Sequence, residues 1–169
     1  PPCCTGCTFT NSTAGSTNVR IESKDATCVA LPTTQLLRPE RNRTELAREV
    51  NLEQPMHPIY SYAAITDAEE GLILVDVETL ADFEPRNNFF ERAVTWNPDG
   101  LLTGASYATF AGHLLYVSTP RGIVVVDLDE PKSPKALATI PLVNPRGTMV
   151  QFRYLFAVDD EGLKVVDVT

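Results

Sequence analysis

Four cysteines lie near the start of the chain, at positions 3, 4, 7 and 28. An even number of cysteines in a short segment rich in Thr and Ser predicts disulfide bonds and an oxidising compartment. Cys3 and Cys4 are adjacent, so each is expected to bond elsewhere. More than one pairing of Cys3, Cys4, Cys7 and Cys28 satisfies this condition, and the sequence does not choose among them.

Metal ligation by the same four cysteines is the alternative. Zinc sites are commonly built from two Cys-x-x-Cys pairs, and this chain has one, Cys4-x-x-Cys7. Covalent haem attachment requires a histidine directly after such a pair, but Thr8 follows Cys7. We therefore predict disulfides and no cofactor on this chain, with haem or a metal on a partner or an adjacent domain as the alternative.

The two histidines offer little evidence of catalysis. A Ser-His-Asp or Cys-His site needs partners that converge in space, and the chain has no Gly-x-Ser-x-Gly motif. His57 precedes Pro58 in an expected linker, and His113 follows Gly112 in an expected hairpin turn. We predict no catalytic residues; axial ligation of a partner's cofactor by either histidine is the alternative.

Three aspartates, Asp76, Asp127 and Asp167, each end a short apolar run. Carboxylates at the end of a strand can bind cations, but they also accept hydrogen bonds from the turn that follows. A side chain that recurs in every unit does not mark one site, so we predict that these three aspartates fix turns. The acidic runs Asp67–Glu70 and Asp159–Glu161 are expected to form a solvated rim. A weak Ca²⁺ site is the alternative, but the spacing of these residues lacks an EF-hand loop.

The apolar runs belong to a repeat. The segments Gly71–Val77, Gly122–Leu128 and Gly162–Val168 align on their glycines, which are 51 and 40 residues apart. Each follows another strand-like run and a short turn. The most complete unit has four expected strands, at 105–110, 114–117, 123–128 and 135–140. Four short strands in about 40 residues are typical of a β-propeller blade.

The repeated phrases "GLILVDV", "GIVVVDL" and "GLKVVDV" resemble those of the LVIVD-repeat proteins. In "VVDLDEPKSPKALATI" the turn with two prolines and the outer strand also resemble this family. The resemblance covers about residues 60–169 and implies β-propeller blades, but it says little about function. The first repeat departs from the pattern, because an insertion at about 78–100 replaces the proline turn.

We therefore predict an all-β fold of four-stranded β-propeller blades, with about two and a half repeats in an incomplete ring. The expected parts are a polar cysteine arm at 1–40, a short helix and linker at 41–59, and the blades at 60–169. Closed propellers have about four to eight blades, so further blades of the same polypeptide or other chains are expected to complete the ring. The start at Pro1-Pro2 suggests a processed chain or a piece of a longer one.

The net charge of −8 disfavours binding to nucleic acid or to an anionic membrane surface. No apolar run approaches the roughly 20 residues of a membrane span. The cysteines, together with two Asn-x-Ser/Thr glycosylation sequons at Asn11 and Asn42, suggest an extracytoplasmic protein, periplasmic or extracellular. The first functional hypothesis is a non-catalytic scaffold or protein-interaction module. The alternative is part of a secreted redox or hydrolytic enzyme, in which the propeller carries a cofactor or a partner.

Disulfide mapping of the non-reduced protein tests the prediction for the four cysteines. We expect every cysteine in a bridge, and no bound metal or haem by elemental analysis and absorbance. Free thiols that bind a stoichiometric metal would contradict the disulfide prediction and favour the redox alternative.

Overall fold

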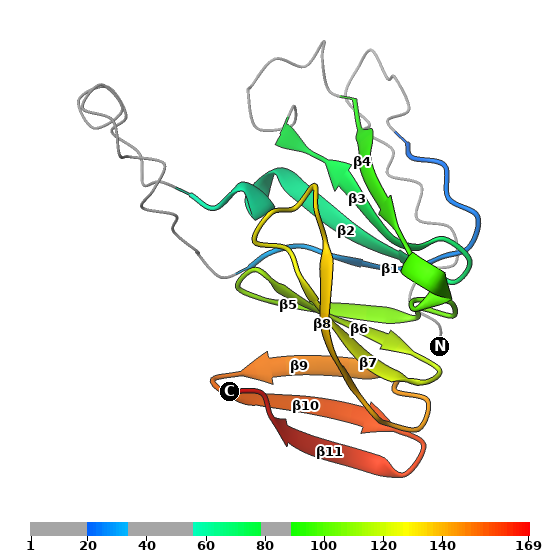
Figure 1. The fold of residues 1–169 in the computed structure, drawn as a ribbon, viewed down its shortest axis with the longest axis vertical. Helices are drawn as coiled ribbons and strands as arrows, with labels where there is room; N and C mark the ends of the chain where they lie inside the picture. Colours follow the sequence, from blue (N-terminus) through cyan, green and yellow to red (C-terminus); the bar gives the residue numbers. More distant parts are fainter. Residues whose placement is uncertain (1–19, 34–55, 79–88) are drawn as a thin grey trace, which may run out of the picture.

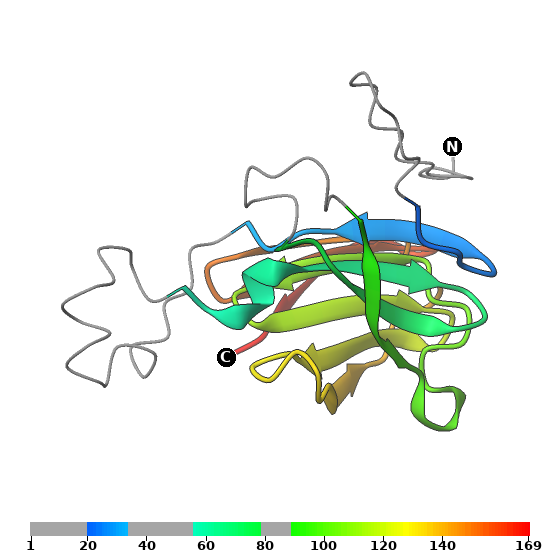
Figure 2. The same ribbon diagram turned by 90° about the horizontal axis from the view of Figure 1, so that it is seen from above.

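The computed structural model describes residues 20–33, 56–78 and 89–169. These residues form β-strands arranged in three antiparallel sheets, with strand orders β1-β2-β3-β4, β5-β6-β7-β8 and β11-β10-β9. Figures 1 and 2 show the three sheets, with β9, β10 and β11 at the red end of the colour scale. The described part of the chain is therefore all-β, as the sequence predicts.

Each sheet runs through consecutive strands of the chain. The first contains β1 (Ala26–Ala30), β2 (Tyr62–Asp67), β3 (Gly71–Asp76) and β4 (Glu91–Trp96). The second contains β5 (Tyr107–Ala111), β6 (Leu114–Thr119), β7 (Gly122–Asp127) and β8 (Lys135–Ile140). The third contains β9 (Gly147–Gln151), β10 (Tyr154–Asp159) and β11 (Gly162–Asp167). Two short 3-10 helices, η2 (Pro58–Ser61) and η4 (Pro98–Gly100), lie before β2 and after β4.

The first sheet is more complete than the sequence indicates. Its first strand, β1, comes from the cysteine arm and pairs antiparallel with β2, so that Val29 lies opposite Ile65. Its fourth strand, β4, follows the insertion and pairs with β3. The chain thus has two four-stranded sheets where the sequence indicated one complete unit. Most of the predicted short helix falls at 34–55, outside the described residues.

The hairpin between the second and third strand of each sheet ends on a glycine with positive φ. These angles are 84° at Gly71, 134° at Gly122 and 128° at Gly162. Residues with a Cβ rarely adopt this conformation. The repeated glycine of the sequence is therefore the residue that lets the chain enter the third strand.

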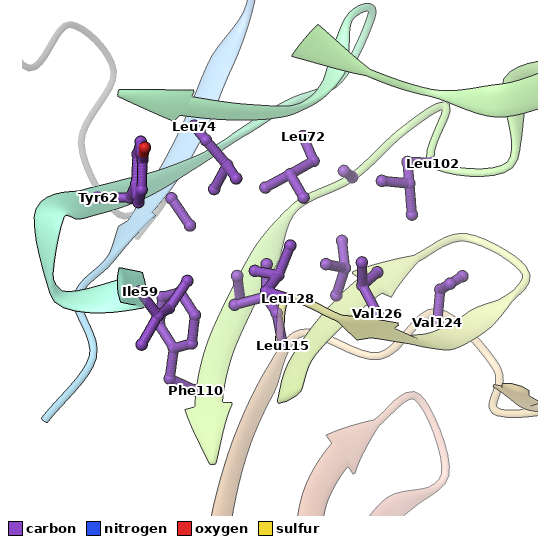
Figure 3. Packing of buried hydrophobic residues seen from close by; sticks show 14 residues of the cluster. Ile59, Tyr62, Leu72, Leu74, Leu102, Phe110, Leu115, Val124, Val126 and Leu128 are labelled. Carbon is purple, nitrogen blue, oxygen red and sulfur yellow. The ribbon is translucent and has the colours of Figure 1, made fainter. Parts of the chain in front are cut away.

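The third strand of the first two sheets is buried on both faces. In β3 and β7 the first five residues are all buried, which explains why they are continuous apolar runs without alternation. Figure 3 shows side chains of the first two sheets meeting in a shared core, among them Leu72 and Leu74 from one side and Val124 and Val126 from the other.

Two smaller clusters continue the packing. One lies between the second and third sheets and contains Tyr116, Ile123, Val125, Leu155 and Ala157. The other covers the opposite face of the first sheet, where Ile21 and Phe90 pack on Ala63, Ile73 and Val75. The chain itself therefore covers one end of the stack of sheets.

The first strands of the three sheets lie side by side, in the order β1, β5, β9 (Figure 1). Threonine hydroxyls link them. Thr27 Oγ1 on β1 lies 2.8 Å from the carbonyl oxygen of Ala105, just before β5. Thr109 Oγ1 on β5 donates to the carbonyl oxygen of Thr148 on β9 at 2.8 Å. The sheets are thus joined along one side and spread apart from it.

Substitution of two equivalent glycines tests this description. A Cβ at Gly122 would lie within 3.0 Å of the Ile140 carbonyl oxygen on β8, whereas a Cβ at Gly162 would meet nothing within 4 Å. Both alanine variants carry the cost of positive φ, about 1–2 kcal/mol. We expect Gly122→Ala to lose about a further 1–3 kcal/mol of unfolding free energy in urea, because the clash adds overpacking. Equal losses at the two positions would contradict the close approach of β8.

Candidate functional site

The three repeated aspartates lie in the same local geometry. The Oδ1 atoms of Asp76, Asp127 and Asp167 each accept a hydrogen bond from the backbone N–H two residues later, at 2.9, 2.8 and 3.2 Å. This is the Asx-turn arrangement. It is the geometry expected for a carboxylate that holds a turn, and it uses one oxygen of each side chain.

Cys28 lies on β1 opposite Thr66. Cys3, Cys4 and Cys7 lie outside the described residues, as do the two glycosylation sequons at Asn11 and Asn42. The prediction of disulfides among the four cysteines therefore stays a prediction.

The structure brings the two histidines together, which the sequence did not predict. The rings of His57 and His113 stack with centroids 6.1 Å apart and planes 24° apart. His57 is buried and caps η2, where its Nδ1 accepts the Ile59 N–H at 3.1 Å. Its Nε2 lies 3.1 Å from Asp129 Oδ1. Since Nδ1 acts as an acceptor, Nε2 carries the proton and donates to the Asp129 carboxylate.

This histidine pair connects the first two sheets. His57 precedes β2 of the first sheet, while Asp129 and His113 belong to turns of the second. His113 Nε2 lies 3.9 Å from Asp127 Oδ1. Both ring nitrogens of His57 contact protein groups, so this imidazole holds the two sheets together and is not placed to take a proton from a substrate.

Three of the six carboxylates in the predicted acidic rim pair with cations, whereas Asp67 and Asp159 are buried and accept hydrogen bonds from backbone N–H groups. Glu70 binds Arg92 at 2.8 Å, Glu161 binds Lys164 at 2.6 Å, and Asp160 forms an ion pair with Arg146. Among residues 20–33, 56–78 and 89–169, no three His, Cys, Asp or Glu side chains form a group suited to a metal ion. The acidic turns are thus held by ion pairs together with backbone hydrogen bonds to Asp67 and Asp159.

The aromatic residues of the insertion have separate roles. Trp96 on β4 packs against the core shared by the first two sheets, and Phe90 packs on the other face of the first sheet. Tyr107 on β5 is half-buried, and Phe89 is exposed. The aromatic side chains that pack do so over neighbouring strands.

The most distinctive surface is the outer face of the third sheet. Side chains that lie opposite one another on neighbouring strands point to the same face of a sheet. On this face, one row across the strands contains Met149, Phe156 and Val165, and the next row contains Val158 and Leu163. Tyr154 lies on the same face at the far end of β10. We call Met149, Tyr154, Phe156, Val158, Leu163 and Val165 the outer face.

The equivalent positions of the other sheets are buried. Leu163 and Val165 are 66% and 55% exposed, whereas Ile123 and Val125 of the second sheet are 0% and 8% exposed. Ile123 and Val125 face the third sheet, and Leu72 and Leu74 face the second in the same way. The apolar rows of the outer face are therefore exposed to solvent. In the first two sheets, the equivalent rows are buried against the next sheet along the chain.

Charged side chains border the outer face. Arg153 Nη2 lies 3.2 Å from Asp167 Oδ2 and stacks over the Tyr154 ring at 5.2 Å. Phe152 is 92% exposed in the β9–β10 turn and has a φ of 56°. A bulky residue at positive φ is a conformational outlier, and outliers of this kind concentrate at functional sites. An apolar centre with a polar border is the composition of a protein interface.

The repeat alignment contains the signal for this surface. Leu163 and Val165 align with Ile123 and Val125, so the alignment alone shows that the third sheet has the same apolar rows. Their exposure does not follow from the alignment, because it depends on what packs against β11. No described strand lies beyond β11.

Comparisons with known proteins assign no family or function to this chain. Scans of protein-family models, of curated proteins and of solved structures found no match to this chain.

Asp67 provides a pH-dependent test of how β1 and the preceding segment are held. Burial raises the pKa of this carboxyl, but hydrogen bonds from Ser23 and from three backbone N–H groups outweigh it, and the net pKa lies below the usual 3.8. A depressed folded-state pKa stabilises the fold above the unfolded value, and this contribution is lost as the pH falls through the folded value. We expect Asp67→Asn to cost about 1–3 kcal/mol at neutral pH, and the difference from wild type to shrink below pH 3.8.

Urea unfolding at a series of pH values measures this effect. Glu91→Gln, at an exposed carboxylate on β4, is the matched control and should leave stability nearly unchanged. A loss for Asp67→Asn that does not vary with pH would contradict the role of its charge.

Proposed function

We propose that this chain is a non-catalytic scaffold or protein-interaction module of an exported, LVIVD-like β-propeller protein. The outer face of the third sheet is the surface that binds a protein partner or a further blade of the same polypeptide. The observation that carries the proposal is the exposure of Leu163 and Val165, since the equivalent residues of both other sheets are buried.

Three features support the propeller part of the proposal. The sheets are antiparallel and follow the chain strand by strand. Their first strands lie side by side, as the inner strands of blades do around an axis. Successive sheets bury apolar rows against each other. A fourth sheet on the outer face would continue the same packing.

The chemistry and arrangement of the outer face support binding of protein. Its side chains are aliphatic, aromatic and thioether groups. Aromatic residues and Met are enriched in interfaces, and the buried centre of an interface is more apolar than the remaining surface. Exposed apolar residues are ordinary when they are scattered, but these lie in adjacent rows across three strands. Ion pairs at the border, such as Arg153–Asp167, are expected to add orientation more than affinity.

The cysteine arm supports the exported setting, as do the two sequons. No helix among the described residues is long and apolar enough to cross a membrane. The redox or hydrolytic alternative gains no support from the histidines, because the contacts of His57 are those of a bridge between sheets.

A capture experiment tests the proposal. The immobilised chain is incubated with an extracytoplasmic extract of the source cells, and bound proteins are quantified by mass spectrometry. A partner bound through the outer face should be reduced about tenfold or more by Leu163→Lys combined with Val165→Lys, because central apolar contacts dominate interface energies. Both positions are largely exposed, so the double variant should keep its fold, which circular dichroism verifies.

Leu137→Lys is the matched control, because Leu137 is 57% exposed on β8 and lies away from the outer face. It should leave capture unchanged. Equal capture by wild type and the double variant would overturn the proposal. No specific capture by wild type would overturn binding of a partner from another chain.

A further inference from the structure

The first sheet has a buried apolar face on which no described sheet packs. In the second sheet, the corresponding residues Val124 and Val126 lie in the core shared with the sheet before it. The residues that align with them in the first sheet are Ile73 and Val75, and both are buried. They form a cluster with Ala63. We call Ala63, Ile73 and Val75 the receiving face, because it has the composition of a face on which another sheet packs.

The segment that leads into β1 covers the receiving face. In this segment, Arg20–Asp25, which we call the strap, Ile21 packs on the receiving face, and Phe90 packs on the same cluster. Ile21 and Ser23 are partly buried, whereas the other four residues of the strap are exposed and three of those are charged at every second position or next to one another. In repeat proteins, a polar surface over the apolar end of a stack is the mark of a cap.

The buried carboxylate of Asp67 anchors the strap to the first sheet. Ser23 Oγ and the Asp25 N–H both donate hydrogen bonds to Asp67 Oδ2, the second at 2.7 Å. The Ala68 N–H in turn donates to the Asp25 carbonyl oxygen at 2.9 Å. Hydrogen bonds to a charged acceptor are stronger than those between neutral groups, so the end of the strap nearest β1 is firmly held.

An ion pair of the first sheet binds the strap at two further points. Glu70 and Arg92 pair at 2.8 Å. Glu70 Oε2 accepts the Lys24 N–H at 3.2 Å, and the Arg92 guanidinium donates to the carbonyl oxygen of Glu22. These bonds go to the backbone of the strap and leave its charged side chains in solvent. The strap is therefore attached to the sheet whose face it covers.

The outer face has the side chains that pack on such a face elsewhere in the stack. Leu163 aligns with Leu72, and Leu72 shares a core with Val124 and Val126 of the second sheet. Val124 in turn aligns with Ile73 of the receiving face. An uncovered receiving face would thus offer the outer face of a second copy the same kind of contact. Because this contact joins opposite ends of the stack, it would repeat from copy to copy and give open filaments.

We infer that the strap is an autoinhibitory contact, which keeps the outer face of a second copy of this chain off the receiving face. The strap replaces a packed sheet with a short segment that is apolar toward the first sheet and charged toward solvent. This inference goes beyond the proposed function, because it concerns the opposite end of the stack. It makes association directional: the outer face stays available, whereas the receiving face is closed.

Analytical ultracentrifugation of the full chain tests this inference. The strap variant, Ile21→Asp combined with Ser23→Ala, removes the apolar contact of the strap and the hydrogen bond from Ser23 Oγ. Wild type should stay monomeric over a series of concentrations. The strap variant should associate as the concentration rises, with a weight-average mass at least about twofold higher, because head-to-tail contacts continue beyond a dimer. Circular dichroism verifies that the strands are kept.

Two controls separate stacking of the two faces from other association. Adding Leu163→Lys and Val165→Lys to the strap variant should return it to a monomer, because docking would bury two unpaired charges. Lys24→Gln is the matched control within the strap. Its side chain is exposed and its hydrogen bond to Glu70 comes from the backbone, so this variant should stay monomeric.

Three outcomes would overturn the inference. One is a strap variant that stays monomeric, and another is a wild type that already associates through its outer face. The third is association of the strap variant that persists after the two lysine changes, which would mean misfolding or contact through another surface. Capture of a partner by wild type is measured with the strap in place, so the proposed function and this inference can fail separately.

Discussion

The structure depends on one constraint, which is that the third strand of each sheet has apolar side chains on both of its faces. Such a strand needs cover on both sides, and β3 and β7 have it. Their sheets are therefore stacked and share cores, and the first strands are drawn together at one side. The same constraint makes β11 exceptional, since its sequence is of the same type but its outward rows at Leu163 and Val165 have no described cover.

Much of the fold follows from the repeat in the sequence. The expected strands at 123–128 and 135–140 correspond closely to β7 and β8, because a glycine, an apolar run and an aspartate are local signals. β1 was not predicted as part of a sheet, since Ala26–Ala30 is short, lies in a polar segment and pairs with a strand far along the chain. Long-range pairing of this kind leaves no local pattern.

The candidate site is less accessible to sequence reasoning than the fold. The meeting of His57 and His113 depends on how two sheets stack, and neither residue belongs to the repeated motif. The outer face is difficult to predict for a different reason. Its residues belong to the repeated motif, and they differ from the equivalent residues of the other sheets only in what packs against them. Chemically alike members of a repeat differ in exposure where one of them lacks a described neighbour, as Leu163 and Val165 do.

The link between His57 and Asp129 has a consequence for how the molecule comes apart. It joins the two sheets that already share the larger apolar core, whereas the third sheet is held through a smaller cluster and threonine contacts. Stacked repeats behave approximately as a chain of units coupled to their nearest neighbours. The first two sheets should thus form one cooperative unit, and the third should open from it at a lower free energy. An occupant of the third sheet would then tighten the least stable part of the molecule, so that binding and local order rise together.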